Sequence, residues 1–219
     1  PDPHLQLDRY PHQLSGGMKQ RVMIAIALAQ EPDVLIADEP TTGLDVTTQA
    51  QILALLKTCQ KQYNMALLLI THNLGIVAQM ADKIAVMYAG HLVEESKTVD
   101  FFKNPKHPYS QKLLAALPEQ SDKTKPLAVI PGRVPMLDHD FKLCRFKDRC
   151  DVAFDICEYK KPDYIPLKEG SQVRCHWYDG QRTLPDKLLK KEAQKQEVIL
   201  NSIHEEQEVI LTVEDLKLH

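Results

Sequence analysis

The stretch that decides the fold is LSGGMKQRVMIAIALAQEPDVLIADEPTTGLD, residues 14–45, which joins a capped helix start to a short apolar strand. Ser15 is a good helix N-cap, and Gly16 and Gly17 let a ligand approach the backbone closely. The free N–H groups at such a helix start form a ready anion site. Apolar residues recur at helical spacing and predict one buried face, made of Met18, Val22, Ala25, Ile26 and Ala29.

The apolar run 34–37 is typical of a parallel strand that is buried on both faces. It places Asp38 and Glu39 at its carboxyl end, where ligands bind in open α/β sheets. Asp45 follows in a turn. A phosphate-binding helix start and paired acids suggest nucleotide hydrolysis. In this reading Asp38 holds Mg²⁺, directly or through water, and Glu39 orients and polarises the attacking water.

Each of these features is weak by itself, because SGG is common in loops and an Asp-Glu pair is often a solvated strand end. Their order and spacing, however, resemble the ATP-binding cassette (ABC) ATPases. LSGGM at 14–18 is similar to the signature of this family, VLIADE at 34–39 to its Walker B segment, and TTGLD at 41–45 to its D-loop. His72, which closes the apolar run MALLLIT, matches the switch histidine of the family.

The resemblance implies that two nucleotide-binding domains sandwich ATP head to tail. Ser15, Gly16 and Gly17 would contact the γ-phosphate of the nucleotide that the partner domain holds. Glu39 and His72 would be catalytic in the site of their own domain, with ATP and Mg²⁺ as cofactors. The D-loop residue Asp45 would couple the two sites.

A P-loop, G-x-x-x-x-G-K-[ST], is missing from the sequence, because none of its eight glycines is followed by lysine. The predicted fold is therefore α/β: the C-terminal half of an ABC-type P-loop NTPase domain over 1–118, followed by a small, irregular, cysteine-containing extension. We expect that the chain was cut upstream of residue 1. By itself it is expected neither to bind ATP tightly nor to hydrolyse it.

Further elements follow from the pattern of apolar and turn residues. Ala89-Gly90 predicts a hairpin turn between two strands, because Gly90 supplies the positive φ that such a turn requires. The expected helices are 46–60, 74–80, 98–102 and 109–117, and the expected strands are 65–71, 84–88 and 91–95.

The residues after 103 narrow the resemblance to one group of ABC proteins. NPKHPYSQKLLAALP at 104–118, IPGRVP at 130–135 and the cysteine-containing segment resemble the C-terminal extension of bacterial oligopeptide/dipeptide permease ATP-binding subunits. YPHQLSGGMKQR at 10–21 is also similar to the form of the signature in this group. Without the resemblance, the His107-Pro108-Tyr109 segment indicates only a helix start. The predicted extension is 119–180.

Four of the five cysteines lie close together in the sequence, with the spacing C-x5-C-x6-C-x17-C. This is not the paired C-x2-C form that is typical of structural zinc, and four thiolates also suit a [4Fe–4S] cluster. The resembled family is associated with such a cluster in this extension. Zinc and free thiols stay open as alternatives, and His176 is an alternative ligand. Cys59 is expected to be a buried thiol, and the candidate ligands are Cys144, Cys150, Cys157 and Cys175.

The C-terminal residues have a different composition. Residues 181–207 are rich in Lys, Glu and Gln and are predicted to be a charged linker. Residues 208–219, EVILTVEDLKLH, return to strand-like alternation and resemble the first strand of an ABC nucleotide-binding domain. We therefore expect that a second ABC domain was fused here, because tethering raises the effective concentration of the partner half.

The leading prediction is an ATP-hydrolysing subunit that energises an ABC importer of peptides. A net charge of −3 gives no indication of a nucleic-acid partner. No apolar run reaches the roughly 18 residues that span a bilayer, and the start is not a signal peptide. The expected location is therefore the cytoplasmic face of the plasma (inner) membrane, as a peripheral protein. The implied partners are a second nucleotide-binding domain, transmembrane permease subunits and, indirectly, an extracytoplasmic peptide-binding protein.

Two alternatives stay open from the sequence. An ABC-type DNA-repair ATPase shares the signature, the Walker B segment and the switch histidine, but it carries long heptad arms that are not seen here. The chain could also be the inactive remnant of a split transporter gene. The solute is equally open between a dipeptide, an oligopeptide, a nickel chelate and another small solute.

Overall fold

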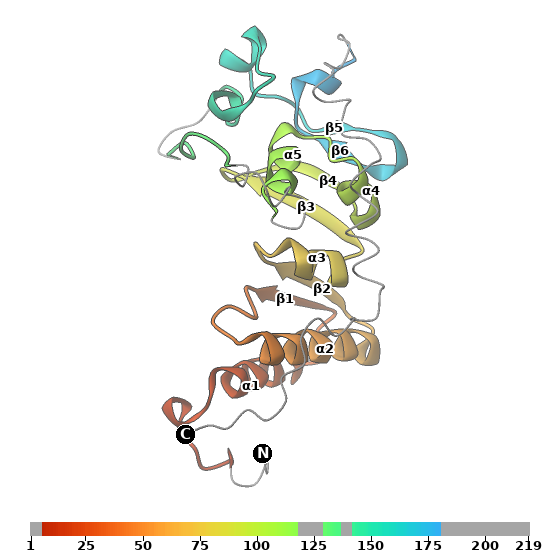
Figure 1. The fold of residues 1–219 in the computed structure, drawn as a ribbon. Coiled ribbons are helices and arrows are strands. Elements are labelled where there is room, and N and C mark those ends of the chain that lie inside the picture. The colour runs from red at the N-terminus through yellow and green to blue at the C-terminus, as the bar shows by residue number, and fades with distance from the viewer. Residues whose placement is uncertain (1–5, 118–128, 137–141, 181–219) are drawn as a thin grey trace, which may run out of the picture. The chain divides into compact units, whose positions relative to one another are not determined.

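The computed structural model describes residues 6–117, 129–136 and 142–180 (Figure 1). It divides into two compact units, Pro1–Ala81 (unit 1) and Asp82–His219 (unit 2). The predicted linker and the strand-like tail lie outside the described residues. Among the residues that are described, no helix is both long and apolar enough to cross a membrane.

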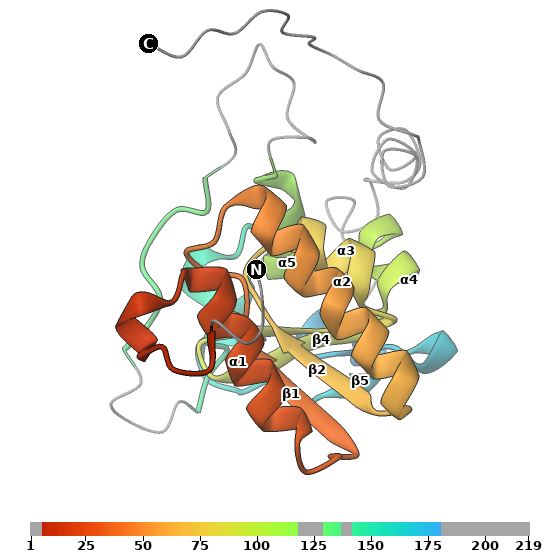
Figure 2. The same ribbon diagram turned by 90° about the horizontal axis from the view of Figure 1, so that it is seen from below.

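Unit 1 is built on two parallel strands that are joined by a helix, as the sequence predicted. Val34 lies opposite Ala66, and Asp38 opposite Ile70, so the carboxyl ends of both strands meet at one edge. Helices α1 and α2 lie over one face of this sheet (Figure 2). The elements in chain order are a 3₁₀ helix Pro11–Gln13, α1 Gly16–Leu28, β1 Val34–Asp38, α2 Val46–Tyr63, β2 Ala66–Ile70 and α3 Leu74–Met80.

The face of α1 that packs on the core is not the predicted one. Gly17 and Ile24 are buried, whereas Val22 and Ile26 are exposed. The prediction failed because apolar residues stand on every side of α1, so their spacing does not single out one face. Cys59 is buried, as predicted. The core of unit 1 consists of Ile24, Leu35, Ile52, Leu56, Cys59 and Met65.

The expectation that β1 is buried on both faces is also wrong for the described chain. Leu35 is buried on the face that α1 and α2 cover, but Val34 and Ile36 on the opposite face are 54% and 62% exposed. A continuous apolar run indicates the surface that a strand could bury, but neighbouring elements decide which surface it does bury.

Unit 2 begins with the predicted hairpin. Ala89 and Gly90 have φ values of 47° and 76°, and positive φ at both central residues identifies a type I′ turn. Buried aromatic side chains of α4 pack beside this hairpin, with the rings of Phe101 and Phe102 in a T-shaped, edge-to-face arrangement. The elements are β3 Lys83–Tyr88, β4 His91–Lys97, α4 Thr98–Lys103, α5 Pro108–Ala115, β5 Ile165–Pro166, β6 Gln172–Val173 and 3₁₀ helices Lys147–Arg149, Asp155–Glu158, Lys168–Gly170 and His176–Tyr178.

The cysteine-containing segment is less irregular than predicted, because it adds two strands to the hairpin. The sheet has the order β3-β4-β6-β5, with Glu94 opposite Val173 and Ile165 opposite the same valine. Each added strand has only two residues, which is too short for an alternating pattern to be seen. The sheet therefore combines strands from both sides of residue 118, where we predicted a domain boundary.

Candidate functional site

Glu39 and His72 meet at the carboxyl ends of the two parallel strands of unit 1. Nδ1 of His72 lies 2.6 Å from Oε1 of Glu39, and the backbone N–H of His72 donates to the same oxygen at 3.1 Å. The hydroxyl of Thr42 donates to Oε2 at 2.8 Å. The hydrogen bond with the His72 side chain, and then the one with Thr42, hold the pKa of Glu39 below its usual value.

The backbone of Glu39 adopts a conformation that is rare for a residue with a side chain. Its φ is 46°, in the left-handed region. The N–H of Glu39 donates to the carbonyl of Ile70 at 2.9 Å, so the β1–β2 hydrogen bonding continues past the end of the strand. A non-glycine residue in this region costs about 1–3 kcal/mol and is often found at functional sites.

Asp38 is the last residue of β1 and is exposed. It is next to Glu39 in sequence and lies opposite Ile70 in the ladder. Asp38 is thus accessible at the sheet edge where the sequence predicted a Mg²⁺ ligand.

The signature residues form the helix start that the sequence predicted. The hydroxyl of Ser15 accepts the N–H of Met18 at 3.3 Å and caps α1. Gly16 and Gly17 are the first residues of the helix, whose N–H groups have no intrahelical acceptor. These two N–H groups are the donors that such a helix offers to an anion.

The two glycines also pack against the D-loop segment, which the sequence did not reveal. A Cβ added at Gly16 would lie 3.1 Å from Cδ2 of Leu44, and a Cβ added at Gly17 would overlap Cγ2 of Thr48. Residues 16–17 therefore lie directly beside residues 44–48, and α1 and α2 approach closely because residue 17 has no side chain.

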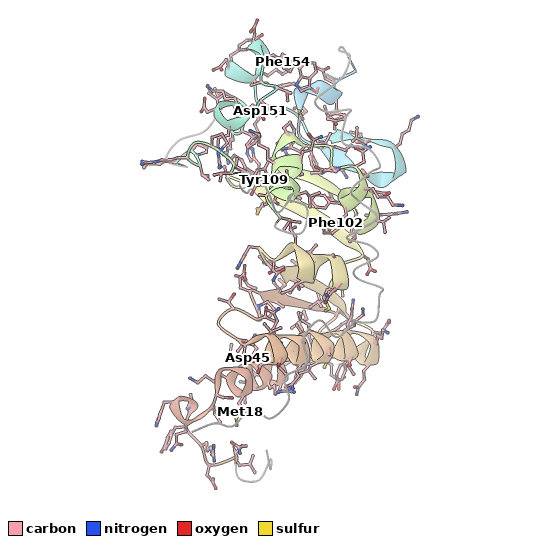
Figure 3. All side chains as sticks on the ribbon, viewed as in Figure 1. Met18, Asp45, Phe102, Tyr109, Asp151 and Phe154 are labelled. Atoms are coloured by element: carbon pink, nitrogen blue, oxygen red, sulfur yellow. The ribbon has the colours of Figure 1, made fainter. Side chains whose placement is uncertain are left out.

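Asp45, which we predicted to act in the D-loop, is the N-cap of α2. Its Oδ1 accepts the N–H of Thr48 at 2.9 Å, and hydrogen bonds with Thr48, first with its side chain and then with its backbone, lower the pKa of Asp45. An Asp directly before an apolar-periodic segment is a sequence signal for such a cap. Figure 3 labels Asp45 and Met18 at the starts of α2 and α1.

The four candidate metal ligands of unit 2 lie near one another. A hydrogen bond between the side chains of Cys144 and Cys157 raises the pKa of Cys144 and lowers the pKa of Cys157 to about 6. Burial raises the pKa of Cys150 to about 11 and the pKa of Cys175 to about 12. The charge of Cys157 also raises the pKa of Cys150, and the charges of Cys150 and Cys157 raise that of Cys175. Nε2 of His176 lies 2.9 Å from the carbonyl of Lys160.

These thiols are close but are not arranged as a metal site. Within the described ranges, no group of three or more His, Cys, Asp or Glu side chains has a geometry that could hold a metal ion. The donor chemistry fits a metal, because four cysteines gather in one small region. The metal site therefore stays a prediction.

Comparisons with known proteins give two family matches, in separate parts of the chain. Residues 2–42 match the family described as "ABC transporter", and residues 93–157 match "Oligopeptide/dipeptide transporter, C-terminal region". The dipeptide transport ATP-binding protein DppD of Escherichia coli (strain K12) is 52% identical over 177 residues, which is 81% of this chain and 54% of that protein. The oligopeptide transport ATP-binding protein AppD of Bacillus subtilis (strain 168) is 48% identical over 173 residues, 79% of this chain and 53% of that protein.

Among solved structures, the ATP-binding cassette MJ0796, in a dimeric post-hydrolysis state with ADP and Pi, matches with a TM-score of 0.38 and 35% identity. That match covers 42% of this chain and 39% of the other. The chain spans about half the length of the curated relatives it matches.

Proposed function

Because this chain belongs to the ABC transporter family, as a relative of its dipeptide and oligopeptide transport ATP-binding proteins, we propose that it is part of an ATPase subunit that energises peptide import. One observation carries the catalytic part of this proposal: Glu39 and His72, 33 residues apart, are in contact at the carboxyl edge of the parallel strands. The match of residues 93–157 favours the transporter over the alternative of a DNA-repair ATPase.

In the proposed mechanism Glu39 polarises the attacking water. The lowered pKa keeps its carboxylate ionised at neutral pH. Oε1 is held by the ring and the backbone N–H of His72, while Oε2 accepts one hydrogen bond, from Thr42. A carboxylate oxygen accepts about two hydrogen bonds, so Oε2 has room for a water molecule. His72 acts as a positioning residue, because it fixes the rotamer of the carboxylate.

Asp38 would hold Mg²⁺ at the same edge, directly or through water. Bound Mg²⁺–ATP supplies the phosphoryl group and neutralises the charge that develops on its oxygens. Ser15, Gly16 and Gly17 would act on the other nucleotide of the head-to-tail pair, by offering the first N–H groups of α1 to its γ-phosphate. Asp45, through its cap on α2, would keep the D-loop beside this helix start.

The proposed assembly is inferred from the relatives, which are named as transport ATP-binding proteins. The chain would work at the cytoplasmic face of the membrane, with transmembrane permease subunits and a second nucleotide-binding domain. An extracytoplasmic peptide-binding protein would deliver the solute to the permease and not to this chain. In this division residues 1–118 serve the nucleotide-binding domain and residues 119–180 form the family-specific extension.

The ATPase proposal can be tested in a chimera in which residues 6–180 replace the matching segment of the E. coli relative. We expect ATP hydrolysis by the chimera, and its loss in Glu39→Gln with ATP binding kept, because the amide preserves shape but cannot polarise water as a carboxylate does. Glu31→Gln, an exposed acid near the end of α1, is the matched control. Near-normal turnover by a folded Glu39→Gln chimera would refute the assignment.

We further propose that Cys144, Cys150, Cys157 and Cys175 hold a [4Fe–4S] cluster, with zinc as the alternative. The proximity of the four thiols supports this, because a cluster of this kind is held by four cysteine sulfurs. Protein purified without oxygen should be brown, with about four irons per chain. Cys150→Ser should lose the iron, and the core variant Cys59→Ser should keep it. Colourless protein with a single zinc would overturn the cluster.

A further inference from the structure

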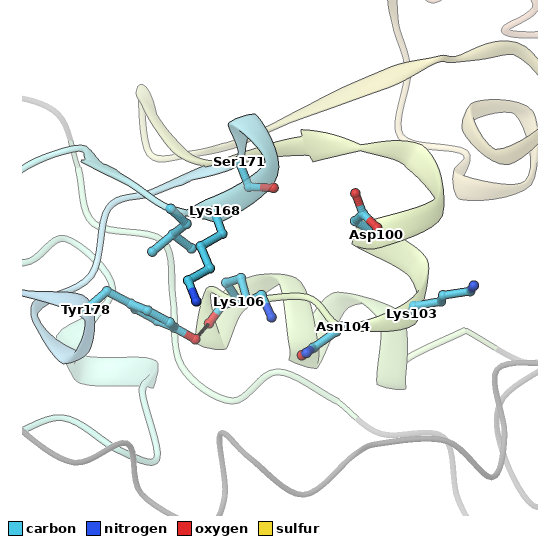
Figure 4. A pocket seen from close by; sticks show the side chains of 8 residues that line it. Asp100, Lys103, Asn104, Lys106, Lys168, Ser171 and Tyr178 are labelled. Carbon is cyan, nitrogen blue, oxygen red and sulfur yellow. Dashed lines mark hydrogen bonds between the residues drawn. The ribbon is translucent and has the colours of Figure 1, made fainter. Parts of the chain in front are cut away.

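The lining of a cavity in unit 2 includes three lysines and the hydroxyl residues Ser171 and Tyr178. The cavity has a volume of about 500 Å³ and lies between the segment that joins α4 to α5 and the loop before β6 (Figure 4). Its charged lining residues are Lys103, Lys106 and Lys168 against a single acid, Asp100. The mechanism proposed above uses none of these residues, and the net charge of this lining is positive.

The backbone that carries Lys106 is held firmly on both sides. Its N–H donates to Oε1 of Glu94 at 2.7 Å, and its carbonyl accepts the hydroxyl of Tyr178 at 3.0 Å. Glu94 is almost fully buried behind this peptide, and its other oxygen accepts the N–H of His107 at 2.8 Å. The carboxylate of Glu94 is thus already used by the backbone.

Lys168 is presented from the opposite wall by a closed loop. The N–H of Leu167 donates to the carbonyl of Ser171 at 2.8 Å, and the N–H of Ser171 donates back to the carbonyl of Lys168 at 3.3 Å. Figure 4 shows the ammonium of Lys168 directed toward Tyr178 and Lys106, whereas Lys103 points away from them. Lys106 and Lys168 therefore line the cavity from opposite walls, on backbones that are fixed before any ligand arrives.

We propose that this cavity binds the phosphate group of a small phosphomonoester. Lysine ammonium groups are compact charges with rotatable donors and bind phosphate as point charges, whereas the planar carboxylate is matched best by the fork of arginine, which the lining residues do not include. The volume lies in the range of organic ligand sites, so it leaves room for an attached organic group. Asp100 on the far wall would accept a hydrogen bond from a hydroxyl or amino group of this attached organic group.

The test measures binding of inorganic phosphate and of glycerol 3-phosphate to the 219-residue chain by calorimetry at low salt. Lys106→Ala and Lys168→Ala should each weaken binding by about tenfold, since each removes a charge-assisted hydrogen bond. Lys83→Ala, on β3 of the same unit, is the matched control and should bind as the original chain does. Far-UV circular dichroism checks that every variant is folded.

A second arm separates a soluble ligand from a lipid headgroup, because phosphatidic acid carries the same phosphomonoester. Phosphatidylcholine vesicles with and without phosphatidic acid are sedimented with the chain. Binding of the soluble probes, or of phosphatidic acid vesicles alone, supports the site if Lys106→Ala and Lys168→Ala abolish it. Three results would overturn the proposal: no binding up to about 10 mM, equal weakening by Lys83→Ala, or equal binding of succinate.

Discussion

Replacing Gly17 with alanine should destabilise unit 1, although alanine is the better helix former. The new Cβ would overlap the Cγ2 methyl of Thr48, and Thr48 is held in place because Asp45 accepts its N–H at 2.9 Å. Overpacking of this kind costs about 1–3 kcal/mol. Replacing a helical glycine with alanine returns about 0.5–1 kcal/mol. The expected net loss is about 1 kcal/mol, which lowers the melting temperature of a unit of this size by about 4–8 °C.

A double-mutant cycle makes this prediction specific. Thr48→Ser removes the methyl group that overlaps, so Gly17→Ala combined with Thr48→Ser should recover most of the lost free energy of unfolding. Gly16→Ala is the control, because its Cβ would lie 3.1 Å from the flexible end of Leu44, which can move. The free energy of unfolding is measured by urea titration, with hydrogen exchange of the α1 and α2 amides assigning the change to unit 1.

This prediction would be refuted if Gly17→Ala left the free energy of unfolding unchanged, or if adding Thr48→Ser to it recovered none of the lost free energy. Either result would show that the close approach of α1 and α2 does not constrain residue 17. The result matters for the proposed function. If Gly17 is required for packing, loss of activity on its replacement does not by itself prove that it contacts phosphate. The Gly17→Ala and Thr48→Ser pair separates the two roles, because repacking can restore stability without restoring anion binding.

Two further predictions concern unit 2. Burial lowers the pKa of His107 from 6.5 to about 3. Below pH 6.5 the unfolded chain therefore binds a proton at His107 that the folded chain does not. The free energy of unfolding should fall toward pH 3 by up to about 1.4 kcal/mol per pH unit. His107→Asn keeps a cap for α5 without this titration, so urea midpoints at several pH values should give a flatter profile, and an unchanged slope would contradict the assignment. Arg149 donates to the carbonyls of Pro131 at 2.7 Å and Ile130 at 3.0 Å. Arg149→Lys cannot make both hydrogen bonds, so proteolysis near Pro131 should be faster than in the control Arg133→Lys. Equal rates would show that these two hydrogen bonds do not hold the segment in place.

The sequence by itself determined the features that a few neighbouring residues encode. Ser15 caps α1, Ala89-Gly90 forms the hairpin turn, and Glu39 stands just past the end of a strand. The helix predicted at 74–80 agrees with Leu74–Met80 residue for residue. Each of these depends on capping, backbone conformation or a short apolar run, which are local properties of the chain.

The tertiary structure alone decided which distant residues meet and which faces are buried. It brought His72 within 2.6 Å of Glu39, packed Gly17 against Thr48, and paired Val173 with Glu94. It also left apolar residues of α1 and β1 exposed that their spacing had placed in the core. The physical reason is that burial depends on the surface that packs opposite a residue, and that partner is supplied by a different part of the chain.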